Sequence, residues 1–185
     1  MDYREQAKLY YLYMMTDGDV TDGEKKLFNK ICKELNLDTD DKKNIKLECE
    51  EISKKEKMTC IEVVKKNVEE TYVYGVMSLN FINNISAEDK AKILWNLINL
   101  GYADSSFTMS ERKVVDYLRK YWKISDSLYQ EMIDVAETCL ALEKHKLWIE
   151  GLPDSEYKLE KTKQVKKDIK DVQKTIATTI SEIEF

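Results

Sequence analysis

Four carboxylates fall within eight residues near the N-terminus, with no Lys or Arg among them: Asp17, Asp19, Asp22 and Glu24. Carboxylate oxygens grouped in this way are the ligands that Ca²⁺ and Mg²⁺ prefer. The segment is not an EF-hand loop, because that loop needs Gly at its sixth position and Glu at its twelfth, where this chain has Asp22 and Phe28. The pattern therefore predicts a divalent-cation site of another kind. The alternative is a turn whose acidic residues stabilise a helix N-terminus by about 0.3–1 kcal/mol.

The segment around Glu24 has a counterpart further along the chain. Thr21 and Glu24 stand three residues apart, as do Thr108 and Glu111, and the second pair follows the first after 87 residues (108 − 21 = 87). This is the spacing of a capping box, in which the hydroxyl accepts from the backbone N–H of the glutamate and the carboxylate accepts from that of the threonine. Each pair therefore predicts a helix that begins directly after its threonine.

Apolar positions repeat at the same distance along the chain. Matched pairs include Leu27 with Val114, Ile31 with Leu118 and Leu35 with Trp122. Caps and an apolar stripe that recur together indicate a duplicated helical unit. We expect two related halves over about residues 1–57 and 86–150. A central helix is expected between them over residues 60–82, beginning at a third capping box formed by Thr59 and Glu62.

The composition favours an all-α fold built as one compact domain. Of the 185 residues, 43 % are hydrophobic and 35 % are charged, and the five Gly and one Pro are too few for the many tight turns of an all-β fold. The length is enough for one core. The formal net charge is −5 and no stretch is strongly basic, which argues against binding to nucleic acid.

Several features favour a cytoplasmic location. The N-terminal residues show neither the basic region nor the apolar region of a secretory signal peptide. The longest apolar-rich run, 72–82, has about half of the ~20 residues that a membrane span needs. The cysteines form no CxxC pair and are expected to be buried small hydrophobes in a reducing compartment: Cys32, Cys49, Cys60 and Cys139.

A linker separates the last part of the chain from the rest. Gly151 stands two residues before the sole proline, a combination that ends a helix, and Asp154 could cap the next one. We therefore divide the chain into a helical domain over 1–150 and a linker with an amphipathic helix over 151–185. The apolar residues of that helix follow spacings of three and four: Val165, Ile169, Val172, Ile176, Ile180 and Ile183. This stripe could pack on the rest of the chain or pair with a second copy in a homodimer.

Enzymatic chemistry finds little support in the sequence. The one histidine, His145, lies in a charged stretch with no Ser or Cys beside it, so a Ser-His-Asp or Cys-His site is not indicated. Gly18 and Gly23 match no phosphate-binding loop. We therefore expect that this chain is not an enzyme and has no catalytic residues.

Aromatic residues are expected mainly in the core. The first helix, expected over residues 2–15, carries four tyrosines between residues 3 and 13 and is expected to be partly packed and partly exposed. The three tryptophans lie on or beside apolar stripes, and we expect them to be core residues: Trp95, Trp122 and Trp148.

The repeated motif resembles a known family. The run from Asp17 to Glu24, between two amphipathic helices and followed by Leu27-Phe28 and Leu35-Asn36-Leu37, resembles the TerB family of tellurite-resistance proteins. It is also similar to the N-terminal region of DjlA-type co-chaperones. The second copy, from Asp104 to Glu111, fits the duplicated helical pattern of the family. The resemblance covers about residues 1–150 and implies a compact all-α fold of two related halves.

The resemblance implies a biological role but no chemical reaction. Members of the family are linked to resistance to tellurite and other stresses, and acidic loop residues are thought to touch metal ions. In this chain that role falls on Asp17, Asp19, Asp22 and Glu24, and more weakly on Asp104 and Glu111. The second loop departs from the pattern, because Ser105, Ser106 and Met109 replace Gly18, Asp19 and Asp22.

Two functional hypotheses follow from the sequence. The first is a non-enzymatic TerB-like module that acts by interaction with an unidentified protein and could bind Ca²⁺ or Mg²⁺ at residues 17–24. The alternative is a purely structural interaction or oligomerisation protein that uses the helix over 154–185 and no metal.

Overall fold

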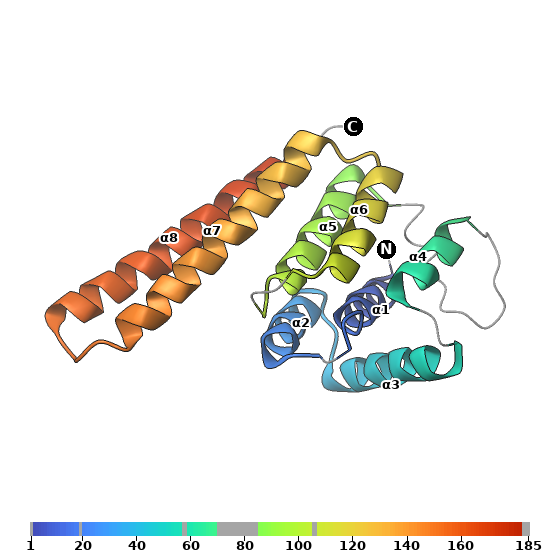
Figure 1. Cartoon of the computed structure of the whole chain (residues 1–185), viewed down its shortest axis with the longest axis horizontal. Coiled ribbons are helices and arrows are strands. Elements are labelled where there is room, and N and C mark those ends of the chain that lie inside the picture. The colour runs from blue at the N-terminus through green and yellow to red at the C-terminus, as the bar shows by residue number, and fades with distance from the viewer. Residues whose placement is uncertain (1, 19, 57–58, 70–84, 105–106, 183–185) are drawn as a thin grey trace. The chain divides into compact units, whose positions relative to one another are not determined.

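The computed structural model describes residues 2–18, 20–56, 59–69, 85–104 and 107–182. Within these ranges the chain forms helices joined by short turns, and no strand occurs (Figure 1). The all-α fold expected from the composition is therefore confirmed. The chain divides into two compact units, Met1–Lys123 and Ile124–Phe185.

The first unit is built around its N-terminal helix. Its helices are α1 (Tyr3–Met14), α2 (Asp22–Glu34), α3 (Thr39–Glu56), α4 (Cys60–Glu69), α5 (Ala87–Gly101) and α6 (Met109–Tyr121). Every residue of α1 from Gln6 to Met14 is buried, because α1 packs against α2, α3, α4 and α5. Of its tyrosines, Tyr3 is exposed but Tyr10, Tyr11 and Tyr13 are buried, so α1 is more deeply packed than the sequence indicates.

The helices repeat at the distance found in the sequence. Both α2 and α6 have 13 residues, and they begin 87 residues apart, at Asp22 and Met109 (109 − 22 = 87). The ends of α1 and α5 lie at the same distance (101 − 14 = 87). The duplication read from caps and apolar positions is therefore also present in the backbone.

The helix expected over residues 60–82 is described over its first part, as α4. The remainder of that range, 70–82, lies outside the described residues. Within α4, Cys60, Val63 and Val64 are buried, and the helix contacts α1 and α6. The glutamate half of the expected capping box is present, because Glu62 Oε2 accepts hydrogen bonds of 2.7 Å from both the backbone N–H and the hydroxyl of Thr59.

Buried polar contacts join α1 to its neighbours. Lys8 is 7 % exposed, and its Nζ lies 2.7 Å from Glu48 of α3. The Tyr10 hydroxyl accepts from Gln6 Nε2 at 2.6 Å and from Asn96 Nδ2 of α5 at 3.1 Å. These contacts specify how α1 sits in the unit, because a buried polar group that loses its partner costs about 1–3 kcal/mol.

The second unit is an antiparallel pair of long helices, α7 (Asp126–Glu150) and α8 (Glu156–Ser181) (Figure 1). The start of α7 follows that of α3 by 87 residues (126 − 39 = 87), so the repeat extends to a third helix. Val165 and Ile169 of α8 form a buried cluster with Ile149 of α7. The amphipathic C-terminal helix is therefore confirmed, and its apolar stripe is covered by α7 of the same chain.

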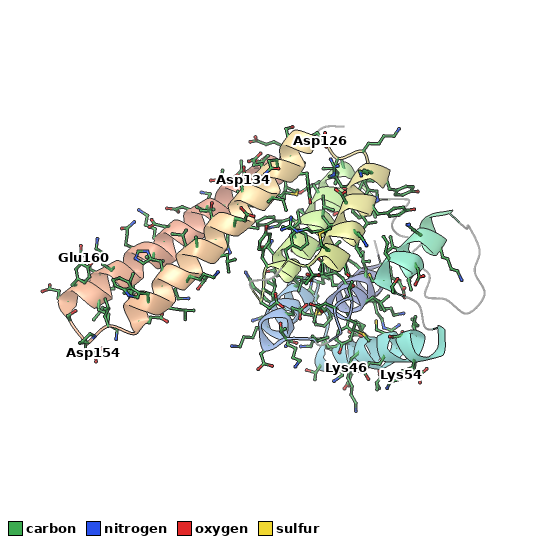
Figure 2. All side chains as sticks on the ribbon, in the orientation of Figure 1. Lys46, Lys54, Asp126, Asp134, Asp154 and Glu160 are labelled. Atoms are coloured by element: carbon green, nitrogen blue, oxygen red, sulfur yellow. The ribbon has the colours of Figure 1, made fainter. Side chains whose placement is uncertain are left out.

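Two details of this unit correct the sequence analysis. Ser155, rather than Asp154, caps α8: its hydroxyl accepts from the Lys158 N–H at 3.2 Å. Asp154, at the turn between the helices in Figure 2, instead lies 2.9 Å from Lys158 Nζ. Trp148 is 60 % exposed and is not a core residue, because the adjacent Ile149 takes the position that faces α8.

Candidate functional site

The first acidic segment contains a complete capping box. The Thr21 hydroxyl accepts from the Glu24 N–H at 3.2 Å, and Glu24 Oε2 accepts from the Thr21 N–H at 2.7 Å and from its hydroxyl at 2.9 Å. Glu24 is 2 % exposed. A carboxylate that the sequence places at a surface turn is therefore buried, and one of its oxygens is fully engaged by the threonine.

The second segment repeats this geometry. The Thr108 hydroxyl accepts from the Glu111 N–H at 3.3 Å, and Glu111 Oε2 accepts from the Thr108 N–H at 2.7 Å and from its hydroxyl at 2.8 Å. Glu111 is also 2 % exposed. The capping roles expected for Thr21, Glu24, Thr108 and Glu111 are all present.

The two repeats approach each other closely near these caps. A Cβ on Gly23, in the first turn of α2, would lie 2.4 Å from the backbone oxygen of Ala103. A Cβ on Gly101 would lie 2.5 Å from Phe107 and 2.7 Å from the Tyr13 hydroxyl. Because only glycine fits at these points, the start of α2 can rest directly on the loop that carries Asp104.

The pKa values show that the acidic residues of the two loops act on one another. The pKa of Glu111 is raised to about 7, chiefly by burial and to a smaller extent by the carboxylates of Asp17 and Asp104, against the opposing effect of the Thr108 hydrogen bonds. Burial also raises the pKa of Glu24, again with contributions from Asp17 and Asp104. Each aspartate therefore raises the pKa of the glutamate in its own repeat and the pKa of the glutamate in the other repeat.

The pair Thr59 and Glu62 shows how burial affects the pKa of the glutamate. Glu62 makes the same two hydrogen bonds to Thr59, but it is exposed. Those hydrogen bonds lower its pKa. Hydrogen bonds from the threonine therefore favour the charged carboxylate, and burial next to other carboxylates raises the pKa at Glu24 and Glu111 instead.

The other residues predicted as cation ligands in the first acidic segment are Asp22 and Asp19. The side chain of Asp22 is 91 % exposed and lies 3.4 Å from Lys25 Nζ. Asp19 lies outside the described residues. Over the described ranges of the chain, no three His, Cys, Asp or Glu side chains are grouped so that they could hold a metal ion. Among these residues the ligand set predicted for a cation is thus incomplete.

Sequence reasoning treated the two acidic segments separately and missed their mutual influence. Nothing in residues 17–24 alone shows that Asp104 acts on Glu24. The signal that could have indicated it is the repeat itself, because a helical unit that is duplicated within one core can bring equivalent loops together.

The cysteine thiols are poorly suited to act as nucleophiles. All four cysteines are buried, as expected, and burial raises the pKa of Cys32 to about 11 and those of Cys49 and Cys60 to about 12. A thiol with such a pKa is protonated at neutral pH and reacts slowly. His145 is exposed and stacks on Trp148, with ring centroids 5.9 Å apart.

Comparison with known proteins identifies one relationship. The family model described as "Tellurite resistance protein TerB" matches residues 5–134 of this chain. Comparisons with curated proteins and with solved structures gave no match. In the described part of the chain, no helix combines the length and the apolar character that crossing a membrane requires. The match spans the whole of the first unit from residue 5 and the start of α7.

Proposed function

This chain belongs to the TerB family, and we propose that it is a non-enzymatic interaction module whose paired acidic loops respond to a divalent cation. Family membership makes it a helical domain associated with tellurite resistance. The proposed action is binding to another protein. The buried, protonated cysteines support the absence of thiol chemistry and suit the reducing cytoplasm.

One observation carries the cation proposal: Asp17 and Asp104 both act on Glu24 and on Glu111. Carboxylates of both loops thus contribute to raising the pKa values of Glu24 and Glu111, and the capping hydrogen bonds offset only part of this rise. A cation near these loops would favour the ionised forms of Glu24 and Glu111, whose pKa values are raised. Ca²⁺ and Mg²⁺ suit such oxygen groups, and Mg²⁺ in particular keeps several waters and can be held by one or two carboxylates.

The test is titration of the full chain with MgCl₂ or CaCl₂ at neutral pH, followed by calorimetry and by the melting temperature. We expect a rise in melting temperature with ion concentration, because an ion that binds only the folded state stabilises it. Asp17→Asn and Asp104→Asn should each weaken this response. Asp40→Asn, which removes an exposed first-turn carboxylate of α3, is the matched control and should leave it unchanged.

Asp22→Asn separates two forms of the cation proposal. If the site is the contiguous 17–24 loop, loss of Asp22 weakens the response as much as loss of Asp17. If the site is formed by the two loops together, Asp104→Asn weakens the response more than Asp22→Asn does. A melting temperature that does not change at millimolar ion contradicts both forms and leaves only the interaction module.

The alternative is a structural interaction or oligomerisation protein without metal. The observation that favours it is that Glu24 Oε2 and Glu111 Oε2 are already used by the capping boxes. A homodimer through the α8 apolar stripe would compete with α7 for the same residues. Light scattering of the full chain tests this alternative: a concentration-independent monomer mass would exclude the homodimer.

A further inference from the structure

α8 carries a basic surface on the side that does not face α7. The buried side of this helix is formed by Val165, Ile169, Ile176 and Ile180. Five lysines follow one another at spacings of three, one, three and four residues: Lys163, Lys166, Lys167, Lys170 and Lys174. At 3.6 residues per turn they occupy an arc of about 100° and a length of about 16 Å along the helix. We refer to these five residues as the lysine face.

The lysine face is exposed, and its lysines form no ion pair with the residues that the structure describes. All five side chains are exposed, and none forms an ion pair with another described residue, whereas Lys158 at the start of α8 is paired with Asp154. Asp168 and Asp171 lie outside the arc, and Asp168 accepts instead from Gln164 at 2.7 Å. Exposed positive charge is therefore concentrated along one line of a rigid helix.

An apolar residue continues this line toward the turn. Leu159 precedes Lys163 by four residues, falls within the same arc by the 3.6-residue period, and is 62 % exposed. Glu156 lies on the same arc, and Glu160, labelled in Figure 2, lies at its edge. The surface thus combines a leucine, flanking carboxylates and a row of lysines.

The charge balance of the unit disfavours large polyanions as partners. Residues 124–185 contain 13 acidic and nine basic residues and no arginine, and the whole chain carries a net charge of −5. Phosphate backbones favour proteins with a positive surface and are recognised best by arginine. An anionic lipid surface would press Glu156 and Glu160 against its own negative charge when Leu159 makes contact.

A discrete acidic segment avoids these penalties. In a helix, carboxylates three and four residues apart lie along one side with the same rise per residue as the lysines. Each lysine can then meet a carboxylate, while Leu159 contacts an apolar side chain at one end of the segment. The five lysines span about 16 Å of the helix and Leu159 lies about 6 Å beyond them. Glu156 and Glu160 therefore lie beside the apolar end of the segment and not beside its carboxylates.

From this geometry we infer that the lysine face of α8, with Leu159 at its end, is a docking surface for an acidic, helical segment of a partner protein. The inference concerns the second unit and does not depend on a cation at the acidic loops. Its test is therefore done with chelator present, so that failure of the cation proposal leaves it unaffected.

The probe is a labelled synthetic peptide of about 20 residues, long enough as a helix to cover the face, with Glu at every third or fourth position and one terminal Leu. Fluorescence anisotropy with the full chain at low salt should show saturable binding that weakens as salt is added. The same peptide with Gln in place of Glu should not bind. Lys163→Gln/Lys167→Gln/Lys170→Gln should weaken binding about tenfold, because three exposed ion pairs are lost.

The control variant removes the same number of positive charges from the first unit. Lys26→Gln/Lys33→Gln/Lys113→Gln removes three exposed lysines from the first unit and should change the affinity less than about twofold. An equal loss in both triple variants, or no binding of the acidic peptide by the unaltered chain, overturns the inference. Tighter binding of duplex DNA, of vesicles of phosphatidylglycerol, or of a second copy of the chain would also overturn it.

Discussion

Asn36 and Lys123 occupy equivalent positions in the two repeats and share an uncommon backbone conformation. Both are in the left-handed region, with φ of 58° and 57°, and they are 87 residues apart (123 − 36 = 87). Each directly follows the C-cap of its helix, which is Leu35 in α2 and Trp122 in α6. Each N–H donates to the carbonyl of the residue three positions before it, Lys33 or Lys120. The duplication therefore includes the way in which α2 and α6 end.

This pair yields a prediction about stability. A lysine in the left-handed conformation costs energy that glycine does not, and asparagine tolerates the conformation better than lysine. Lys123→Gly should therefore raise the free energy of unfolding by about 0.5–1 kcal/mol, and Asn36→Gly should change it by less. Urea unfolding followed by circular dichroism measures both, and a larger gain at Asn36 would contradict the explanation.

Glu111 should make stability depend on pH. Its pKa is about 7 in the folded chain against 4.5 without the fold, so between these values the folded state holds a proton that the unfolded state has released. The contribution of Glu111 to stability is therefore fully present below about pH 4.5 and is lost as the pH rises through about 7. Glu111→Gln keeps a side chain that fits a capping box and should stabilise the chain at pH 8 by roughly 1–3 kcal/mol.

The matched control for that variant is Glu62→Gln. Glu62 makes the same hydrogen bonds, but its pKa is lowered, so its contribution to stability is present above the unfolded pKa and is lost as the pH falls. Glu62→Gln should therefore not stabilise the chain at pH 8. Unfolding curves at several pH values between 4 and 8 compare the two variants, and a parallel response would show that burial of Glu111 is not the cause.

The contact between the repeats should not tolerate a larger residue. Gly23→Ala places a methyl group 2.4 Å from the Ala103 carbonyl oxygen, and the backbone must shift to accept it. We expect a loss of about 1–3 kcal/mol, although alanine is the better helix former. Gly151→Ala, whose nearest neighbour would lie at 3.4 Å, is the control and should be neutral. Thermal melting distinguishes these results.

The exposure of Trp148 can be measured by fluorescence. Trp148 is 60 % exposed and Trp122 is 5 % exposed, and Trp95 is half-buried. Acrylamide should therefore quench the emission of Trp148 most strongly. Trp148→Phe should remove most of the quenchable component without reducing stability. If quenching persists in that variant and disappears in Trp122→Phe, the assignment of the exposed ring is wrong.

The capping boxes were predictable because their hydrogen bonds join residues three positions apart. Thr21 with Glu24 and Thr108 with Glu111 need only local helical geometry to form, and the helices begin directly after these threonines. The buried stripe of α8 was predictable for a similar reason, since residues three and four apart share one side of a helix. What covers that stripe was not, and only the structure shows it to be α7.

The sequence by itself determined the all-α fold, the 87-residue repeat and the places where the helices begin, because each depends on neighbours along the chain. The tertiary structure alone decided that Glu24 and Glu111 are buried, that Asp17 and Asp104 each act on both, and that Tyr10 is inside while Trp148 is outside. Burial and the pKa of a carboxylate depend on groups brought close by packing, and no local pattern in the sequence records those distances.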